Sequence, residues 1–230
     1  MRLVRQLQVA GKSLHVIDEK VKLDLAAPGR AIFTVAEPGN ISSNQLVVFE
    51  LGYAGRELQR WFIGYVEKVV PVGNARAKLF CRQLSAVLAN KLPLDLRHVS
   101  LRDVLTKINQ DTGLNFATPD QDYAKRQVAN FYNLGTGYQA MNMLGRVFNI
   151  PDFIWQQQGN GVIYVGSWAD SRWSQVKNIV LPANMFDQVQ ANNQARLPAM
   201  PQLRPGLRLN GKRLTEITFQ QNHMDLIWKN

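Results

Sequence analysis

The sequence predicts a mainly β protein with a small α+β insertion, and three observations lead to this fold class. Short runs of β-branched and aromatic residues, separated by turn signals, fill the first third of the chain. The middle third changes to a helical period, and the last third returns to short strands. With 230 residues, of which 46% are hydrophobic, the chain can form one large domain or two to three small ones.

The first third is expected to contain only strands and turns. Pro-Gly, Gly-Lys and Asp-Glu signals separate the apolar runs at regular spacing. Many short strands with little helix favour a barrel or a sandwich. The expected strands cover residues 3–9, 13–17, 20–25, 30–36, 45–53, 61–70 and 75–83.

The hairpin between residues 49 and 70 is the most informative segment of this region. Two runs rich in aromatic and β-branched residues flank Ala54-Gly55, as is typical of a tight β-turn. The return run, residues 61–70, is long and has Gly64 in its middle. Because glycine weakens a strand, Gly64 indicates a bulge or a sharp corner in a curved sheet.

The middle third predicts two helices and a hairpin. Ser100 and Asp103 form a capping pattern before an apolar helical face, and Gly113 ends that helix. A second apolar face predicts a helix over residues 136–149. The turn Gly159-Asn160-Gly161 then connects two short strands, so this region forms a small α+β unit.

The last third predicts a strand over residues 176–181 and then an irregular, exposed passage, rich in Pro, Gln and Asn, to about Gln202. The turns Asn210-Gly211 and Gln221-Asn222 separate the strands of a β-meander. The predicted domains are an N-terminal barrel (1–92), a small α+β domain (93–170) and C-terminal strands that complete or form a second barrel (171–230).

The net charge of +10 is concentrated in the two β-rich parts. Residues 1–92 hold thirteen Lys and Arg against seven Asp and Glu; the counts are six against seven in residues 93–170 and eight against three in residues 171–230. The basic residues stand singly between apolar ones. This pattern favours a solvated face, or a contact with acidic protein neighbours, over direct phosphate binding.

Several sequence features indicate the cellular compartment in which the protein is expected. Cys81 is the single cysteine, which excludes an internal disulfide and fits a reducing cytoplasm. It is expected to be a small buried hydrophobic residue on a strand. The N-terminal residues lack the apolar region of a signal peptide, and no apolar run is long enough for a transmembrane helix.

No catalytic, cofactor or metal site is predicted. Residues 135–140 fit the dinucleotide pattern G-x-G-x-x-A, but they lack a βαβ frame and a correctly spaced acidic residue, so a helix-entry turn is expected there. The three histidines, His15, His98 and His223, lack metal-ligand spacing. Walker and nucleophile-elbow motifs are absent from the sequence.

A β-barrel that binds single-stranded nucleic acid is the alternative function. An OB-like site needs exposed aromatic rings on one face and basic residues beside them. Aromatic and basic residues are available for such a site: Trp61, Phe62, Tyr65, Phe80 and Tyr53, near Arg56, Arg60 and Lys68. However, alternating strands bury about half of their residues, and these aromatic residues are the natural core candidates.

Three segments, taken in order, carry a resemblance to a known family. They are residues 61–67, residues 100–113 with the following helix and hairpin, and residues 203–214. They are similar to the barrel strand, the small α+β insertion and the returning barrel strands of the baseplate hub (late control protein D-like) family of phage tails. Family members are usually longer, so the chain also resembles a minimal hub or one half of a split hub.

The resemblance implies a non-enzymatic structural protein of the virion tail, assembled in the host cytoplasm, with two tube-like β-barrel domains flanking an α+β unit. It implies a homotrimeric ring that joins the tail tube or distal tail protein to a spike, fibre or central tail protein. DNA passes through the ring, and no cofactor or membrane span is implied. A periplasmic secretion-system module with a similar α+β unit is a third possibility, although no signal peptide is visible. The candidate interface and structural residues are Trp61, Phe62, Gly64, Tyr65, Arg204, Pro205 and Gly206.

Overall fold

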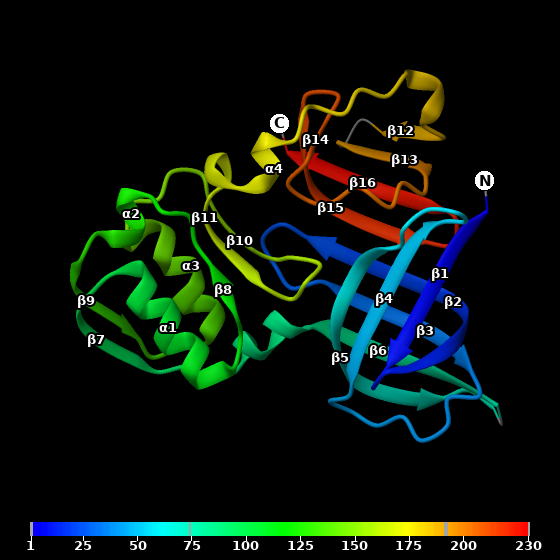
Figure 1. Ribbon diagram of the computed structural model, residues 1–230, viewed down its shortest axis with the longest axis horizontal. Helices are drawn as coiled ribbons and strands as arrows, with labels where there is room; N and C mark the ends of the chain where they lie inside the picture. The colour runs from blue at the N-terminus through cyan, green and yellow to red at the C-terminus, as the bar shows by residue number, and fades with distance from the viewer. Residues whose placement is uncertain (1, 74, 191–192, 230) are drawn as a thin grey trace. The chain divides into compact units, whose positions relative to one another are not determined.

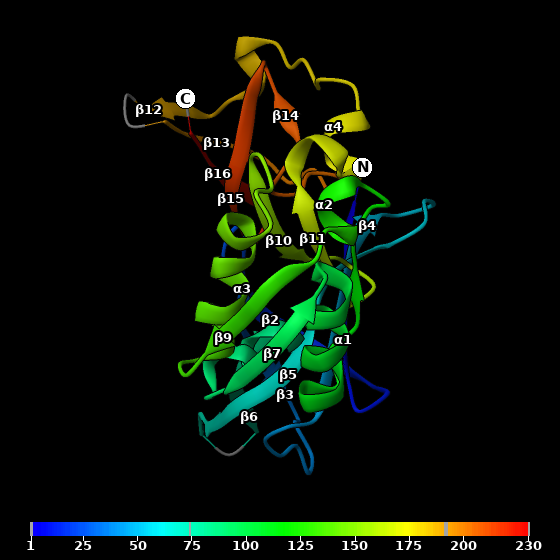
Figure 2. The ribbon, with the colours of Figure 1, turned by 90° about the vertical axis from the view of Figure 1, so that its left-hand side faces the viewer.

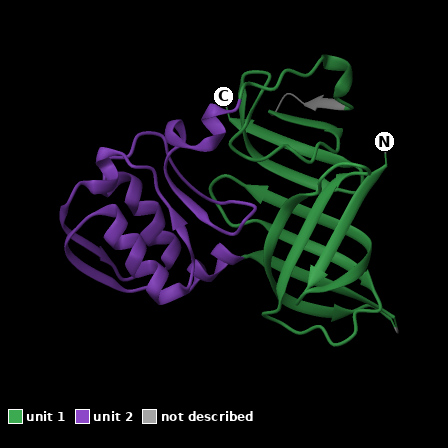
Figure 3. Ribbon diagram, viewed as in Figure 1, with its two compact units in different colours: residues 1–83, 177–230 green, residues 84–176 purple. Residues whose placement is uncertain are grey.

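The computed structural model describes residues 2–73, 75–190 and 193–229. The chain is mainly β, as the sequence predicts, and divides into two compact units (Figures 1 and 3). Unit 1 comprises residues 1–83 and 177–230, and unit 2 comprises residues 84–176. Residues 84–92, which the sequence prediction groups with the first barrel, lie in unit 2.

Six antiparallel strands of unit 1 close into a barrel (Figure 1). They follow the order β1-β4-β5-β6-β3-β2, and β2 pairs back with β1. The pairing of β1 with β2 joins Leu7–Val9 to residues 12–14 and so closes the ring of strands. The strands are β1 (Leu3–Val9), β2 (Lys12–Asp24), β3 (Arg30–Ala36), β4 (Leu46–Tyr53), β5 (Gln59–Pro71) and β6 (Arg76–Gln83).

The C-terminal strands extend the same sheet beyond the barrel. The order continues from β2 through β15, β16 and β13 to β12, and β14 pairs with β15. The turns Asn210-Gly211 and Gln221-Asn222 lie where the sequence predicts them. The elements are η3 (Ala183–Met185), β12 (Gln188–Gln190), β13 (Gln194–Pro198), β14 (Arg208–Leu209), β15 (Lys212–Gln220) and β16 (His223–Lys229).

Strand β2 is continuous where the sequence predicts two strands separated at Asp18-Glu19, so that prediction is wrong. Its register against β3 shifts between Val16 and Asp18, and a β-bulge absorbs the irregularity without a turn. Residues 12–14 pair with β1, whereas residues 20–24 pair with β15. One strand therefore belongs to both the barrel and its extension.

A buried ion pair lies where β2 passes from the barrel to the extension. Glu19 is 3% exposed, and its carboxylate lies 3.0 Å from Nε of Arg5 on β1. Arg5 Nη2 also donates to the carbonyl oxygen of Gln221 (2.6 Å) and to Oδ1 of Asn222 (2.7 Å). These contacts join β1, β2 and the turn between β15 and β16.

Aromatic side chains connect the cores of the barrel and the extension. Phe33 packs against Phe49 and Phe62, with ring centroids 5.1 and 6.4 Å apart. Phe219 of β15 lies 6.1 Å from Phe49 and 5.7 Å from Trp61. All five are buried in one hydrophobic cluster, so unit 1 has one continuous core.

The bend of β5 has a different cause from the bulge that Gly64 indicates. Gly64 pairs regularly with Val47 and Gln83, whereas the register shifts at Trp61 and at Glu67. A Cβ at Gly64 would lie 1.9 Å from the carbonyl oxygen of Arg82. Glycine is therefore needed because the backbone of β6 approaches closely. The turn before β5 is also longer than Ala54-Gly55, since β4 ends at Tyr53 and β5 begins at Gln59.

The passage expected to be irregular contains two strands, and the strand predicted over residues 176–181 is reduced to an isolated bridge between Ile179 and Leu209. In β13, Ala195 and Leu197 point to the core between exposed residues. This alternation is too short to stand out among Pro, Gln and Asn. Residues 191–192 of the passage lie outside the described part of the chain.

Unit 2 is the predicted small α+β unit. Ser100 and Asp103 cap α1 reciprocally, Gly113 ends it with φ of 72°, and Thr136 and Gln139 cap α3. Helix α1 contacts β7, and α3 contacts β9 (Figure 2). Its elements are η1 (Leu84–Ala89), β7 (Leu94–Val99), α1 (Leu101–Thr112), β8 (Phe116–Ala117), α2 (Asp122–Lys125), β9 (Val128–Asn133), α3 (Gly137–Val147), β10 (Phe153–Gln157), β11 (Ile163–Ser167), η2 (Trp168–Asp170) and α4 (Arg172–Gln175).

Replacing Gly64 by Ala tests the close approach of β5 and β6. The added methyl group has to displace backbone, so we expect a loss of about 3 kcal/mol in the free energy of unfolding. Gly39→Ala is the control: it forces a left-handed backbone but meets no atom within 4 Å, and it should cost about 1 kcal/mol. Urea denaturation of both variants measures the difference. Equal losses would show that the strands can separate.

The pH dependence of stability tests the buried pair. Burial raises the pKa of Glu19 from 4.5 to about 7, while the charge of Arg5 and a hydrogen bond from the backbone N–H of Gln221 oppose the shift. The folded protein therefore binds an extra proton between these values, and its stability should fall as the pH rises from about 5 to 8.

The variant Glu19→Gln isolates this contribution. Its thermal midpoint should change less with pH over the same range, because the amide does not titrate. An unchanged pH profile in the variant would assign the effect to another group.

Candidate assembly surface

Two of the predicted interface residues fill the barrel. Trp61 is 1% exposed and Phe62 is fully buried, and both belong to the core of unit 1. They are buried side by side because the bulge at Trp61 breaks the alternation of β5. Tyr65, beyond the buried Gly64, is half-buried and projects from the outer face of the sheet.

The structure brings Arg204 to Trp61, 143 positions away in the sequence. The guanidinium carbon of Arg204 lies 5.1 Å from the centre of the Trp61 ring. Nη2 donates to the carbonyl oxygen of Arg60 (3.0 Å), and Nη1 donates to those of Pro201 and Leu203 (2.8 Å each). Arg204 thus braces the loop before β14 against β5.

Neighbouring residues complete this contact. The hydroxyl of Tyr53 donates to the carbonyl oxygen of Ala199 (2.6 Å), which joins the same loop to β4. Pro205 and Gly206 are buried, and Gly206 has a φ of 98°, a backbone that suits glycine. Its amide donates to the carbonyl oxygen of Leu214 on β15 (2.8 Å). Residues 199–207, which we call the brace loop, are held by three strands.

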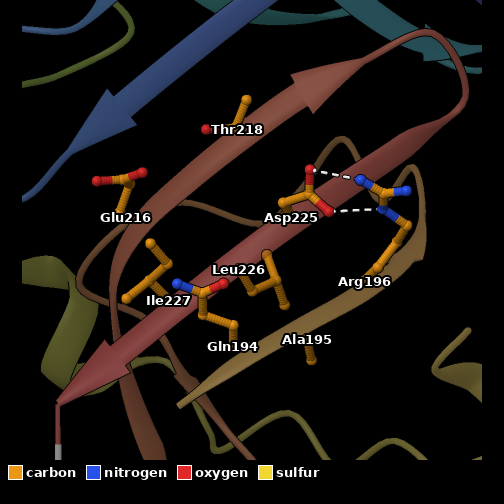
Figure 4. Close-up of a pocket in the computed structure, with 8 residues that line it drawn as sticks. All are labelled: Gln194, Ala195, Arg196, Glu216, Thr218, Asp225, Leu226 and Ile227. Atoms are coloured by element: carbon orange, nitrogen blue, oxygen red, sulfur yellow. Dashed lines mark hydrogen bonds and ion pairs between the residues drawn. The ribbon is translucent and has the colours of Figure 1, made fainter. Parts of the chain in front are cut away.

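A shallow polar depression lies on the extension of the sheet (Figure 4). It has a volume of about 190 Å³ and is lined by residues of β13, β15 and β16. Arg196 and Asp225 form a two-pronged ion pair across it, at 2.6 and 3.1 Å. Because these charges neutralise each other, the depression offers no unpaired nucleophile or base from this pair.

The reactive side chains of the chain are dispersed or buried. Burial and the charge of Glu67 raise the pKa of the Cys81 thiol to about 12, so Cys81 is a poor nucleophile at neutral pH. Among the described residues, no three His, Cys, Asp or Glu side chains are grouped closely enough to hold a metal ion. The Gly135–Gly137 turn serves as the entry to α3, as the sequence predicts.

Among the described helices, none is both long and apolar enough to cross a membrane.

Sequence reasoning identified Trp61 and Arg204 separately but missed their contact and the ion pair of Arg5 with Glu19. Trp61 and Arg204 lie too far apart for local patterns to connect them. The ion pair had a weak signal, since Glu19 occupies an inward position between apolar residues of β2. The contacts of the brace loop had no signal in the sequence, because most of them are made to backbone carbonyl oxygens.

Comparison with known sequences gives one phage relative. No family model matches the chain. An uncharacterized 58.7 kDa protein in the lys 3′ region of Haemophilus phage HP1 (strain HP1c1) is 32% identical over 217 residues. The match covers 94% of this chain and 40% of the phage protein. The chain therefore spans about two fifths of the length of this relative.

Solved structures give the class of fold. The 43 kDa tail protein of prophage MuSo2 from Shewanella oneidensis matches with a TM-score of 0.76 and 10% identity, over 100% of this chain and 98% of that one. A tail protein from Neisseria meningitidis MC58 matches with a TM-score of 0.69 and 11% identity, over 100% and 97%.

A third structure, the E. coli protein c3393, matches with a TM-score of 0.68 and 12% identity, over 97% of this chain and 77% of that one. It is a component of the type VI secretion system with structural similarity to the T4 bacteriophage tail proteins gp27 and gp5. The chain therefore has the fold of phage tail proteins, and the predicted resemblance is confirmed at the level of the fold.

Replacing Arg204 by Met tests the brace. The variant keeps an apolar stem but loses the hydrogen bonds to three carbonyl oxygens and the contact with the Trp61 ring. The free energy of unfolding should therefore fall by about 2 kcal/mol. Arg56→Met, at an exposed turn, is the matched control and should stay within about 0.5 kcal/mol of the parent. Equal effects in urea denaturation would contradict the brace.

Proposed function

We propose that the chain is a structural hub protein of a phage or phage-derived tail baseplate, and that three copies form a ring. The ring joins the tail tube or distal tail protein to a spike, fibre or central tail protein and leaves a channel for DNA. The observation that carries the proposal is the tail-protein fold over the whole chain. The relative from Haemophilus phage HP1 supports a phage or phage-derived origin.

The arrangement of unit 1 suits a ring of pseudo-sixfold symmetry. The barrel of β1–β6 is one tube-like module, and the strands β12–β16 continue its sheet as a second. Three subunits then contribute six modules. In this proposal, residues 1–83 and 177–230 carry the two tube-like modules, and residues 84–176 are the α+β insertion, with bounds a few residues from those predicted from the sequence.

A closed ring needs a heterologous interface, in which one surface meets a different surface of the next subunit. Among the described strands, β12 ends the sheet and pairs only with β13. Such an edge can accept a strand of a neighbouring subunit through backbone hydrogen bonds. We assign β12 to the ring interface on this basis.

The predicted site residues take two roles in this proposal. Trp61, Phe62 and Gly64 build the wall of the first module. The brace loop, with Arg204, Pro205 and Gly206, stiffens that wall, so that a module keeps its shape when it meets a neighbour. Tyr65 is the member of the set whose half-buried ring faces outward, and it is therefore the one assigned to contact.

The proposal assigns the chain no enzymatic activity, no cofactor and a place in the virion tail. The alternative, an OB-like barrel that stacks single-stranded bases, has lost its main support. Trp61 and Phe62, two of the aromatic residues it needs at the surface, are buried.

Light scattering of the purified chain after size exclusion tests the ring. A stable assembly should have three times the chain mass of 26.0 kDa, unchanged over a series of micromolar concentrations. Tail-like particles that contain the chain should hold it in multiples of three. A stable monomer that is never found in such particles would reject the proposal.

A further inference from the structure

Basic side chains that stand singly in the sequence are gathered on one face of the long sheet. Directly paired residues of antiparallel strands project to the same face. Pairing places Arg30 opposite both Arg82 and Lys22, so three cations follow one another across β6, β3 and β2. The whole row, from β5 to β13, is Tyr65, Arg82, Arg30, Lys22, Thr218, Asp225 and Arg196.

The next rows on the same face add further cations. Lys68 and Lys20 lie at the two ends of a row whose centre is formed by Phe80 and Ile32. Lys78 and Arg76 follow on β6 at the alternate positions of the same strand. We define the basic face by these seven cations: Lys20, Lys22, Arg30, Lys68, Arg76, Lys78 and Arg82.

Among the described residues, the ion pairs of this face lie on one side, and Asp18, in one row with Thr34 and Lys78, is a carboxylate of the barrel side that forms none with them. On the extension, Lys22 pairs with Glu216, and Arg196 pairs with Asp225. On the barrel, the other six cations of the basic face form no ion pair with any described residue. Nε of Arg82 is buried without a hydrogen-bond acceptor.

This arrangement is costly to the isolated chain. Like charges placed directly opposite each other in a sheet destabilise it, and a buried donor without an acceptor does the same. An external anion would offset the repulsion between the paired cations. The face is therefore organised as if an anionic partner lies against it.

The composition of the face favours phosphate over an acidic protein surface. Four of the seven cations are lysines, a residue that is depleted in protein interfaces. Lysine and arginine are the residues that neutralise phosphates, and duplex DNA carries one charge per about 1.7 Å of its axis. A dense group of seven cations, six of them without an ion pair to any described residue, matches such a polymer better than a protein surface of mixed sign.

We propose that the basic face contacts the phosphate backbone of double-stranded DNA. The contact is independent of sequence, because it uses charge and does not read base edges. It deepens the proposed function, on which it rests for the source of the DNA: the basic face is the surface of the ring that meets DNA in the channel.

Fluorescence anisotropy with a labelled duplex of about 30 bp tests the contact at salt concentrations from about 50 mM upward. The parent chain should bind, and the logarithm of its affinity should fall with that of the salt concentration, with a slope of about −0.9 for each phosphate contacted. A single strand of the same length should bind no more tightly than the duplex. Absence of binding at the lowest salt would overturn the proposal.

Two triple variants that change the net charge by the same amount distinguish binding through the basic face from attraction by the net positive charge of the chain. Lys20→Glu/Arg30→Glu/Lys78→Glu changes three exposed cations of the face, and Lys12→Glu/Arg56→Glu/Lys177→Glu changes three exposed cations outside it. The first should weaken binding at least about tenfold and flatten the slope by about 3. The second should have a much smaller effect. Equal effects, or stronger competition by poly-L-glutamate than by unlabelled duplex, would reject DNA as the partner.

The single variant Arg30→Glu shows whether weaker DNA binding comes from a lost contact or from an unfolded protein. It places a carboxylate between Arg82 and Lys22, so its thermal midpoint should rise by roughly 2 °C while DNA binding weakens. A fall of the midpoint would contradict the repulsion on which the proposal depends. Mass measurements on the same samples keep the two proposals apart. DNA binding by a monomer would reject the ring and keep the face, whereas a ring without DNA binding would reject the face alone.

Discussion

Unit 1 depends on one strand, β2, that belongs to both the barrel and its extension. Strand β2 closes the barrel through residues 12–14 and carries the extension through residues 20–24. Between these parts, the buried Glu19 forms an ion pair with the partly exposed Arg5, and Arg5 also holds the turn of the β15–β16 hairpin. A buried ion pair contributes little net stability but is costly to break, which suits a joint that must have one geometry.

Much of the barrel was predictable, because alternation and turn residues are local. Strands β1 and β3 begin and end at the predicted residues, and the caps of α1 and α3 lie where the sequence places them. The error at β2 has a physical cause. Asp18-Glu19 has the composition of a turn, and only a distant partner, Arg5, makes a buried glutamate tolerable there.

The candidate surface was predictable in its parts but not in its assembly. Trp61 and Arg204 were identified from separate segments, and their contact depends on the path of a loop that no local pattern describes. The cations of the basic face could not be recognised as a group from the sequence. Lys20, Arg30 and Lys78 are isolated in sequence, and only strand register reveals that they share a face. Charge counts along the chain therefore underestimated the local density of charge.

The closed barrel, the sheet that extends beyond it and the basic outer face support the proposal that unit 1 forms the wall of a ring. Electron cryo-microscopy of tail particles containing the chain tests this account most directly. It predicts three copies around the particle axis, with β2, β3 and β6 bordering the channel and Arg30 facing it. Copies arranged away from the axis, or a channel bordered by other strands, would contradict it.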